Sequence, residues 1–109
     1  MLGREATPRS ADTVFETMKK RIHVFYSGRV QGVGFRITAE ETAQSLGVVG
    51  WVKNLRTGQV ELVAEGDEPV LERFLAEIRN GSMKNFINQV EISWSHASDT
   101  FNEFEIRYY

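Results

Sequence analysis

The apolar residues of this chain change their spacing along the sequence in an order that few folds can accommodate. Alternating or β-branched apolar residues predict five short strands, at residues 22–27, 48–52, 59–65, 90–94 and 104–108. Between the first and second of these strands, and between the third and fourth, the apolar spacing changes to that of a helix face. The sequence therefore predicts a helix inside each of two strand-to-strand connections.

Both predicted helices have recognisable ends. The first has an apolar face formed by Phe35, Ala39, Ala43 and Leu46. Gly47 is placed to end it, as glycine after a helix commonly does. The second has an apolar stripe formed by Val70, Leu71, Phe74, Leu75 and Ile78. Asp67 is a suitable N-cap for this helix, which we expect to end at Asn80 and Gly81.

The order of the elements predicts the topology. A short hairpin that turns at Arg56, Thr57 and Gly58 joins the second and third strands. The chain is then β-α-β-β-α-β with a short strand at its end. Because each strand–helix–strand crossover is right-handed, both helices lie on one face of a single sheet. We therefore expect an α+β fold, the ferredoxin-like split βαβ sandwich, with an antiparallel or mixed sheet.

Length and composition limit the class of protein. The 109 residues suit one domain, and the absence of cysteine excludes disulfides, thiolate metal sites and a cysteine nucleophile. Residues 1–20 have few apolar anchors, so we expect an irregular leader followed by a domain at residues 21–109. No apolar run approaches the roughly 20 residues of a membrane span, and the first residues do not resemble a signal peptide. We expect a cytoplasmic protein that binds no membrane.

The net charge of −2 is unevenly distributed. Residues 1–21 hold five basic and three acidic side chains, which leaves 8 basic and 12 acidic side chains in residues 22–109. An acidic domain is a poor general partner for nucleic acid, because that affinity depends largely on neutralising phosphates. We therefore expect no nucleic-acid partner, and an anionic ligand would need a local binding device.

Common nucleotide and metal motifs are missing from the sequence. The P-loop pattern fails because Val33 stands where its second glycine is required, and the dinucleotide pattern fails at Ile37. The two histidines, His23 and His96, lie in or just after predicted strands and are interpreted as sheet side chains. We interpret four glutamates as side chains on solvent-exposed faces of their elements: Glu40, Glu41, Glu103 and Glu105. We expect no metal ion and no cofactor.

The strongest candidate site lies between the first strand and the first helix. It reads Gly-Arg-Val-Gln-Gly-Val-Gly-Phe-Arg and runs from Gly28 to Arg36. Its glycines allow positive φ angles, so successive backbone N–H groups can point inward. The helix that follows adds unpaired N–H donors and the positive end of its dipole. The segment predicts an anion cradle, with a plain strand-to-helix turn as the alternative.

Arg36 favours the cradle. A cation in the first turn of a helix opposes the macrodipole, which costs about 0.3–1 kcal/mol. An anion held between the loop and the guanidinium removes this conflict, since arginine can hold two phosphate oxygens at once.

A second candidate is Asn54, just before the predicted hairpin. Asparagine at such a position is usually a turn former, but its amide can also orient a water molecule at any pH.

Two segments together closely resemble the signature segments of the acylphosphatases. They are Gly-Arg-Val-Gln-Gly-Val-Gly-Phe-Arg at residues 28–36 and Gly-Trp-Val-Lys-Asn at residues 50–54. The resemblance covers roughly residues 22–109, including the closing Phe-Glu-Ile-Arg at residues 104–107. It implies the ferredoxin-like sandwich and the hydrolysis of carboxyl phosphates to a carboxylate and inorganic phosphate.

The resemblance also implies roles for the site residues. Arg36 would hold the phosphoryl group together with the backbone of Gln31, Gly32, Val33, Gly34 and Phe35. Asn54 would place the attacking water, and Leu55 follows it where some family members carry a threonine. A site without a general acid or a metal suits this substrate, because a carboxylate leaving group with a pKa near about 4 departs unprotonated. We expect a monomer that takes a small acyl phosphate, with inorganic phosphate as product and inhibitor.

Two other functions stay open. The same sandwich binds RNA in other families, although the basic–glycine–aromatic signature is missing from the third strand, where Glu61 and Glu65 stand. The other possibility is a stand-alone relative of the acylphosphatase-like domain of hydrogenase-maturation proteins, which carry larger domains besides. The sequence favours the acylphosphatase enzyme over both.

Overall fold

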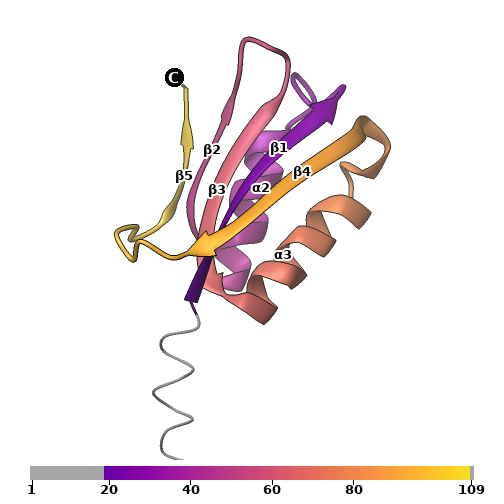
Figure 1. Cartoon of the computed structure of the whole chain (residues 1–109). Coiled ribbons are helices and arrows are strands. Elements are labelled where there is room, and N and C mark those ends of the chain that lie inside the picture. Colours follow the sequence, from indigo (N-terminus) through magenta and orange to yellow (C-terminus); the bar gives the residue numbers. More distant parts are fainter. Residues whose placement is uncertain (1–18, 109) are drawn as a thin grey trace, which may run out of the picture.

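The computed structural model describes residues 19–108, which form one sheet with two helices against it (Figure 1). In chain order the elements are β1 (Lys19–Gly28), α2 (Phe35–Leu46), β2 (Val49–Asn54), β3 (Val60–Asp67), α3 (Glu68–Asn80), the 3₁₀ turn η1 (Lys84–Phe86), β4 (Ile87–His96) and β5 (Phe104–Arg107). The predicted order is confirmed. Apart from Lys19 and Lys20, which begin β1, the predicted leader lies outside the described residues.

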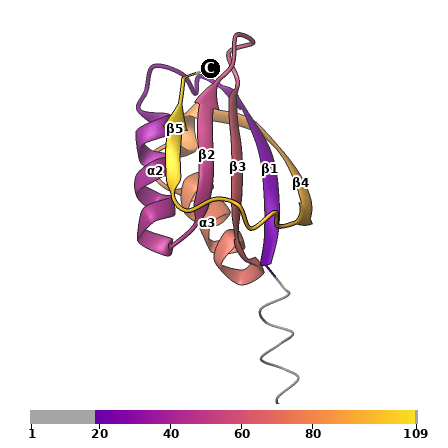
Figure 2. The ribbon, with the colours of Figure 1, turned by 90° about the vertical axis from the view of Figure 1, so that its left-hand side faces the viewer.

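The five strands are arranged in the order β4-β1-β3-β2-β5. Neighbouring strands are antiparallel except β5, which pairs in parallel with β2 and makes the sheet mixed. Both helices cover the same face of the sheet, as the two perpendicular views show (Figures 1 and 2). The ferredoxin-like sandwich predicted from the sequence is confirmed.

Alternation along β1 builds the centre of the core. Ile22, Val24 and Tyr26 point to the helix-covered face and are fully or almost fully buried. The helices supply the opposite side of the core with Phe35, Ala39, Ala43, Leu71, Phe74 and Ile78. Gly47 ends α2 in the left-handed conformation, with φ 73°. Asp67 occupies the N-cap of α3 without a side-chain capping hydrogen bond.

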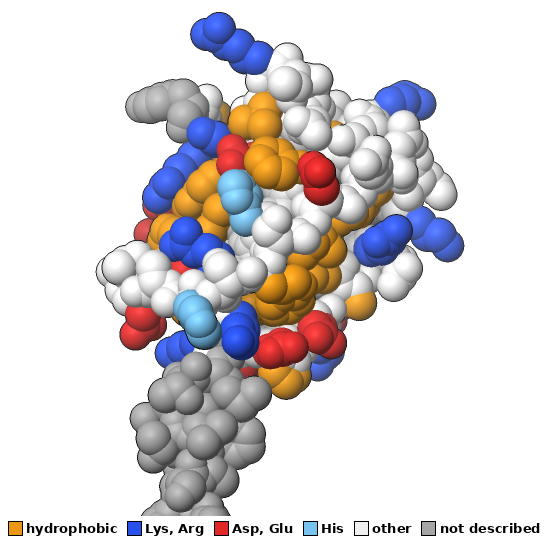
Figure 3. Space-filling model, in the orientation of Figure 1, with side chains coloured by type: hydrophobic (Ala, Val, Ile, Leu, Met, Phe, Trp, Pro, Cys, Tyr) orange, Lys and Arg blue, Asp and Glu red, His pale blue; other side chains and the backbone are white. Residues whose placement is uncertain are grey.

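The edge strand β4 is less covered than the rest of the sheet. Its apolar residues Val90, Ile92 and Trp94 pair with the buried positions of β1, so they belong to the helix-facing side. However, α3 packs mainly over β3 and β1, and Ile92 and Trp94 stay 37% and 42% exposed. Figure 3 shows hydrophobic side chains gathered between β4 and α3. No helix within residues 19–108 is long and apolar enough to cross a bilayer.

Candidate active site

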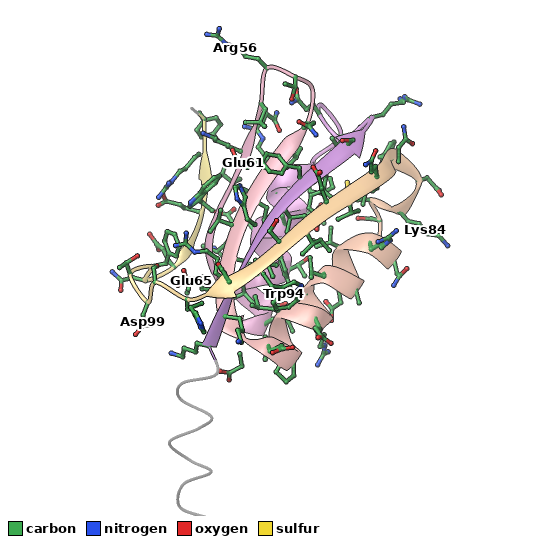
Figure 4. The ribbon with its side chains drawn as sticks, viewed as in Figure 1. Arg56, Glu61, Glu65, Lys84, Trp94 and Asp99 are labelled. Atoms are coloured by element: carbon green, nitrogen blue, oxygen red, sulfur yellow. The ribbon has the colours of Figure 1, made fainter. Side chains whose placement is uncertain are left out.

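Two segments that are distant in sequence meet at one end of the molecule. They are the glycine loop, defined as residues 28–36 between β1 and α2, and the β2–β3 hairpin, defined as residues 54–60 (Figures 1 and 2). Arg56 marks the tip of the hairpin (Figure 4). We call this end of the molecule the glycine-loop end. Both candidate segments of the sequence therefore contribute to a single region.

The glycine loop has the backbone of an anion cradle. Gly32 and Gly34 adopt left-handed conformations with φ 78° and 85°, and no atom lies within 4 Å of where a Cβ would stand at either position. Within residues 19–108, the backbone N–H groups of residues 31–34 donate to no backbone carbonyl. Val30 is fully buried and anchors the loop in the core. The loop therefore offers unpaired backbone donors at the start of a helix.

Arg36 lies in the first turn of α2, as the sequence predicts, and that turn contains no acidic residue. Its guanidinium carbon lies 5.1 Å from the ring centre of Tyr108, just beyond the end of β5. A cation over an aromatic face at this distance is attracted to it. Tyr108 is largely exposed and lies one residue beyond β5, although the sequence placed it in the last predicted strand. Its contact with Arg36 was not predicted, because the two residues lie far apart in the sequence. The contact with the aromatic ring therefore helps to hold the guanidinium of Arg36 in position.

Asn54 is the last residue of β2, where it pairs with Val60 of β3. Its side-chain oxygen Oδ1 is buried and has no hydrogen-bond partner within the described residues. A buried polar atom without a partner is costly and uncommon in folded proteins. A turn-forming asparagine would use this oxygen to bind nearby backbone. The unpaired Oδ1 instead favours a role toward a bound molecule.

The side chain of Gln31 connects the two segments. Its Nε2 donates to the carbonyl oxygens of Leu55 and Gln59, at 2.8 Å each, at the base of the hairpin. A second side-chain amide connects the hairpin to the end of β1, because Gln59 Nε2 donates to Ser27 Oγ at 3.1 Å. The resemblance in sequence implied a role only for the backbone of Gln31. No local pattern could have revealed its side-chain role, because its partners lie 24 and 28 residues away.

Within residues 19–108, the other residues considered in the sequence form no side-chain hydrogen bond or ion pair with Arg36, Asn54 or Gln31. His23 lies on the sheet and its Nε2 contacts Glu61 Oε2 at 2.7 Å, while Glu105 pairs with Arg107. His96 ends β4, and Glu40 and Glu41 lie on α2. Within residues 19–108, no three His, Cys, Asp or Glu side chains are grouped so as to hold a metal ion.

The glycine-loop end therefore combines three elements suited to one ligand. Unpaired backbone donors and the dipole of α2 attract an anion, and Arg36 supplies a full positive charge. The segments 28–36 and 54–60 contain no acidic residue that would oppose it. The neutral amide of Asn54 lies at the edge of the hairpin that Gln31 ties to the loop. Such a site can hold a phosphoryl group and orient a small neutral molecule beside it.

Comparisons with known proteins agree with this geometry. A family model described as Acylphosphatase matches residues 22–106. The chain is 42% identical to an acylphosphatase of Syntrophobacter fumaroxidans over 90 residues, which are 83% of this chain and 93% of the relative. An acylphosphatase of Methylococcus capsulatus is 41% identical over 87 residues, 80% of this chain and 95% of that protein. The crystal structure of acylphosphatase from Bacillus subtilis superposes with a TM-score of 0.77 at 35% identity, and the match covers 82% and 99% of the two chains.

Proposed function

This chain belongs to the acylphosphatase family and hydrolyses acyl phosphates, and from that premise we propose how its residues perform the reaction. The family and the hydrolytic function predicted from the sequence are confirmed. We propose that the backbone N–H groups of residues 31–35 and the guanidinium of Arg36 hold the phosphoryl group. In the same proposal, Asn54 positions the attacking water.

The observation that carries the proposal is the unpaired Oδ1 of Asn54 on a hairpin tied to a loop of unpaired donors. The attacking water donates a hydrogen bond to this oxygen, which turns a lone pair of the water toward phosphorus. A new bond forms between the water oxygen and phosphorus while the bond from phosphorus to the carboxyl oxygen breaks. The breaking bond leaves its electron pair on the carboxylate, and the protons of the water end on phosphate or in solvent.

The chemistry of the substrate explains why so few groups are sufficient. A carboxylate with a pKa near about 4 leaves without taking a proton, so no general acid is required. In a loose transition state, charge spreads over the phosphoryl oxygens, and fixed donors stabilise it there. The loop N–H groups and Arg36 are such donors. We therefore propose hydrolysis that depends on no metal ion or cofactor.

The proposed site residues, 31–36 and Asn54, all fall within residues 21–109, which we propose as the catalytic domain. Because the cradle contacts the phosphoryl group rather than the acyl group, inorganic phosphate should compete with substrate. The monomeric state, the cytoplasmic location and the lack of a nucleic-acid partner stay predictions.

The proposal is tested by phosphate release from benzoyl phosphate, measured with EDTA and with added inorganic phosphate. We expect EDTA to leave the rate unchanged and phosphate to raise the apparent KM without lowering kcat. Activity that disappears in EDTA and returns with Mg²⁺ would refute metal independence. A KM that does not respond to phosphate would remove the glycine loop as the binding site.

A further inference from the structure

A cavity of about 190 Å³ lies between the edge strand β4 and the helix α3, outside the glycine loop. It is lined by Tyr26, Leu75, Ala76, Arg79, Asn80, Val90 and Ile92. Val90 and Ile92 pair with Tyr26 and Val24 of β1, so they share the helix-facing side of the sheet with the buried tyrosine. The walls of the cavity are therefore mainly apolar.

One buried polar group in this lining has no partner. Tyr26 is 1% exposed, and its hydroxyl makes no hydrogen bond within the described residues. Burial raises the pKa of this phenol far above its ordinary value, and the opposing effect of Arg79 is smaller. The hydroxyl is therefore neutral at any physiological pH and able to donate a hydrogen bond. A phenylalanine would fill the same space without leaving a donor unpaired.

A positive charge, Arg79, lines the same cavity and acts on the Tyr26 phenol. Arg79 lies in the last turn of α3, its side chain is exposed, and it forms no ion pair with residues 19–108. Arg73, six residues earlier on α3, differs, because its Nε pairs with Glu77 Oε2 at 2.9 Å. Arg79 is thus available to an anion that enters the cavity. Mainly apolar walls with a few polar groups, here Tyr26, Asn80 and Arg79, are typical of a site for a small molecule, and the cation favours an anionic one.

We propose that this cavity binds a small carboxylate with an apolar body. The carboxylate accepts a hydrogen bond from the Tyr26 hydroxyl and pairs with Arg79, and its hydrocarbon part packs against Leu75, Val90 and Ile92. An apolar cavity of about 150 Å³ accommodates benzene. The volume of about 190 Å³ therefore suits a single ring or a short branched chain that carries one carboxylate.

The site is separate from the glycine loop but adjoins it. The ring of Tyr26 packs against the ring of Phe35, the first residue of α2, with 4.8 Å between ring centres. The probe must therefore be shown to bind at Tyr26 and not at the glycine loop. Saturating inorganic phosphate in every titration occupies the anion cradle.

The test is a titration of the whole protein with benzoate, followed by the backbone amide signals in NMR spectra. We expect the largest shifts at Tyr26, Arg79 and Val90. Tyr26→Phe and Arg79→Gln should each weaken benzoate binding at least tenfold. Arg73→Gln, on the same helix but outside the cavity, should bind benzoate as the unmodified protein does.

Benzyl alcohol, which has the same ring without the charge, is the matched neutral probe and should bind at least tenfold more weakly than benzoate. Thermal unfolding without ligand distinguishes a loss of binding from a loss of stability. Tyr26→Phe should unfold at the same temperature as the unmodified protein or at a higher one. Equal affinity of Tyr26→Phe for benzoate would overturn the proposal. The same conclusion follows if benzyl alcohol binds as tightly as benzoate, or if the shifts concentrate in residues 28–36.

Discussion

The two ends of the sheet differ in whether their polar groups have hydrogen-bond partners. At the glycine-loop end, backbone donors of residues 31–34 and the Oδ1 of Asn54 lack partners within the described residues. At the other end, Glu65 and Asp99 lie together where β4 connects to β5 (Figure 4). The Glu65 carboxylate is 3% exposed and accepts hydrogen bonds from Arg21 Nε, the Ser98 amide and hydroxyl, and the Asp99 amide, at 2.7 to 2.9 Å.

The difference separates stability from function. Burial by itself would raise the pKa of Glu65, but its hydrogen bonds from Ser98, Arg21 and Asp99 outweigh burial and hold the pKa below its ordinary value. A satisfied charged network of this kind fixes the β4–β5 connection. An unpaired buried atom such as Asn54 Oδ1 instead costs roughly 1–3 kcal/mol. In the proposed function a bound ligand completes the pairing at the glycine-loop end, so changes at the two ends should affect different measurements.

The largest effect is expected at Arg36. Arg36→Ala removes the guanidinium that we propose holds the phosphoryl group, so turnover should fall by about 10³-fold or more and inhibition by phosphate should weaken in parallel. Arg36→Lys should restore little, because an ammonium cannot reproduce the planar two-pronged contact. Arg56→Ala at the exposed hairpin tip is the matched control and should retain activity. Normal turnover by Arg36→Ala would show that the glycine loop is only a turn.

Asn54 should separate turnover from binding. Because it orients water and touches the phosphoryl group little, Asn54→Ala should lower kcat by about 10²–10³-fold, or about 3–4 kcal/mol, at a nearly unchanged inhibition constant for phosphate. Asn54→Asp should fail as well, because a carboxylate repels the phosphoryl group. The measurements are kcat and the phosphate inhibition constant, after urea unfolding confirms a folded variant. A variant that turns over normally would make Asn54 a structural turn residue.

The sequence was sufficient for those elements whose signal is local. The glycines and Arg36 stand within one short segment, and their spacing against strand and helix patterns predicts where a cradle begins. The helix limits followed from Phe35, Leu46 and Gly47 for the same reason. Strand ends were predicted less well. Lys19, Lys20 and Arg21 have no strand-like pattern, yet they extend β1 because residues 65–67 of β3 pair with them.

Contacts between residues that are distant in the chain could not be predicted from the sequence. Gln31 finds its acceptors 24 and 28 residues away, and Arg21 meets Glu65 across 44 residues. A polar side chain of this kind looks the same in sequence whether it faces solvent or a carbonyl group. The unpaired hydroxyl of Tyr26 could not be predicted either, because a tyrosine in a strand usually places its hydroxyl at the surface or on a partner.

Gln31 tests whether the glycine-loop end works as one unit. Gln31→Leu removes two hydrogen bonds, but the Leu55 and Gln59 carbonyls keep their bonds to Gly58 and Leu55 amides, so folding should weaken only by about 1–2 kcal/mol. We expect kcat to fall about tenfold because the hairpin no longer holds Asn54 in place. In an Asn54→Ala background the same change should have almost no further effect on kcat. Fully additive losses would contradict a positioning role.

The smallest effect on turnover is expected at Glu65, where stability should change instead. Glu65→Gln keeps the shape of the side chain but loses its charge-assisted hydrogen bonds, so the free energy of unfolding at pH 7 should fall by about 2–3 kcal/mol. The exposed Glu91→Gln on β4 is the matched control and should be nearly neutral. Turnover of both variants should stay within about twofold of the unmodified protein, because the Glu65 network lies at the opposite end from the glycine loop.

The pH dependence of unfolding sharpens this prediction. The folded pKa of Glu65 is lowered, so the charged carboxylate stabilises the fold above the pKa of the unfolded chain, about 4.3. This contribution is lost as the pH falls below that value and through the lower folded pKa. The stability difference between the unmodified protein and Glu65→Gln should therefore be full at pH 7 and shrink on acidification across that range. Urea unfolding at several pH values measures this difference. A difference that stays constant with pH would contradict the stabilising role of the Glu65 charge. A loss of turnover without a loss of stability would mean that the two ends of the sheet are not separate.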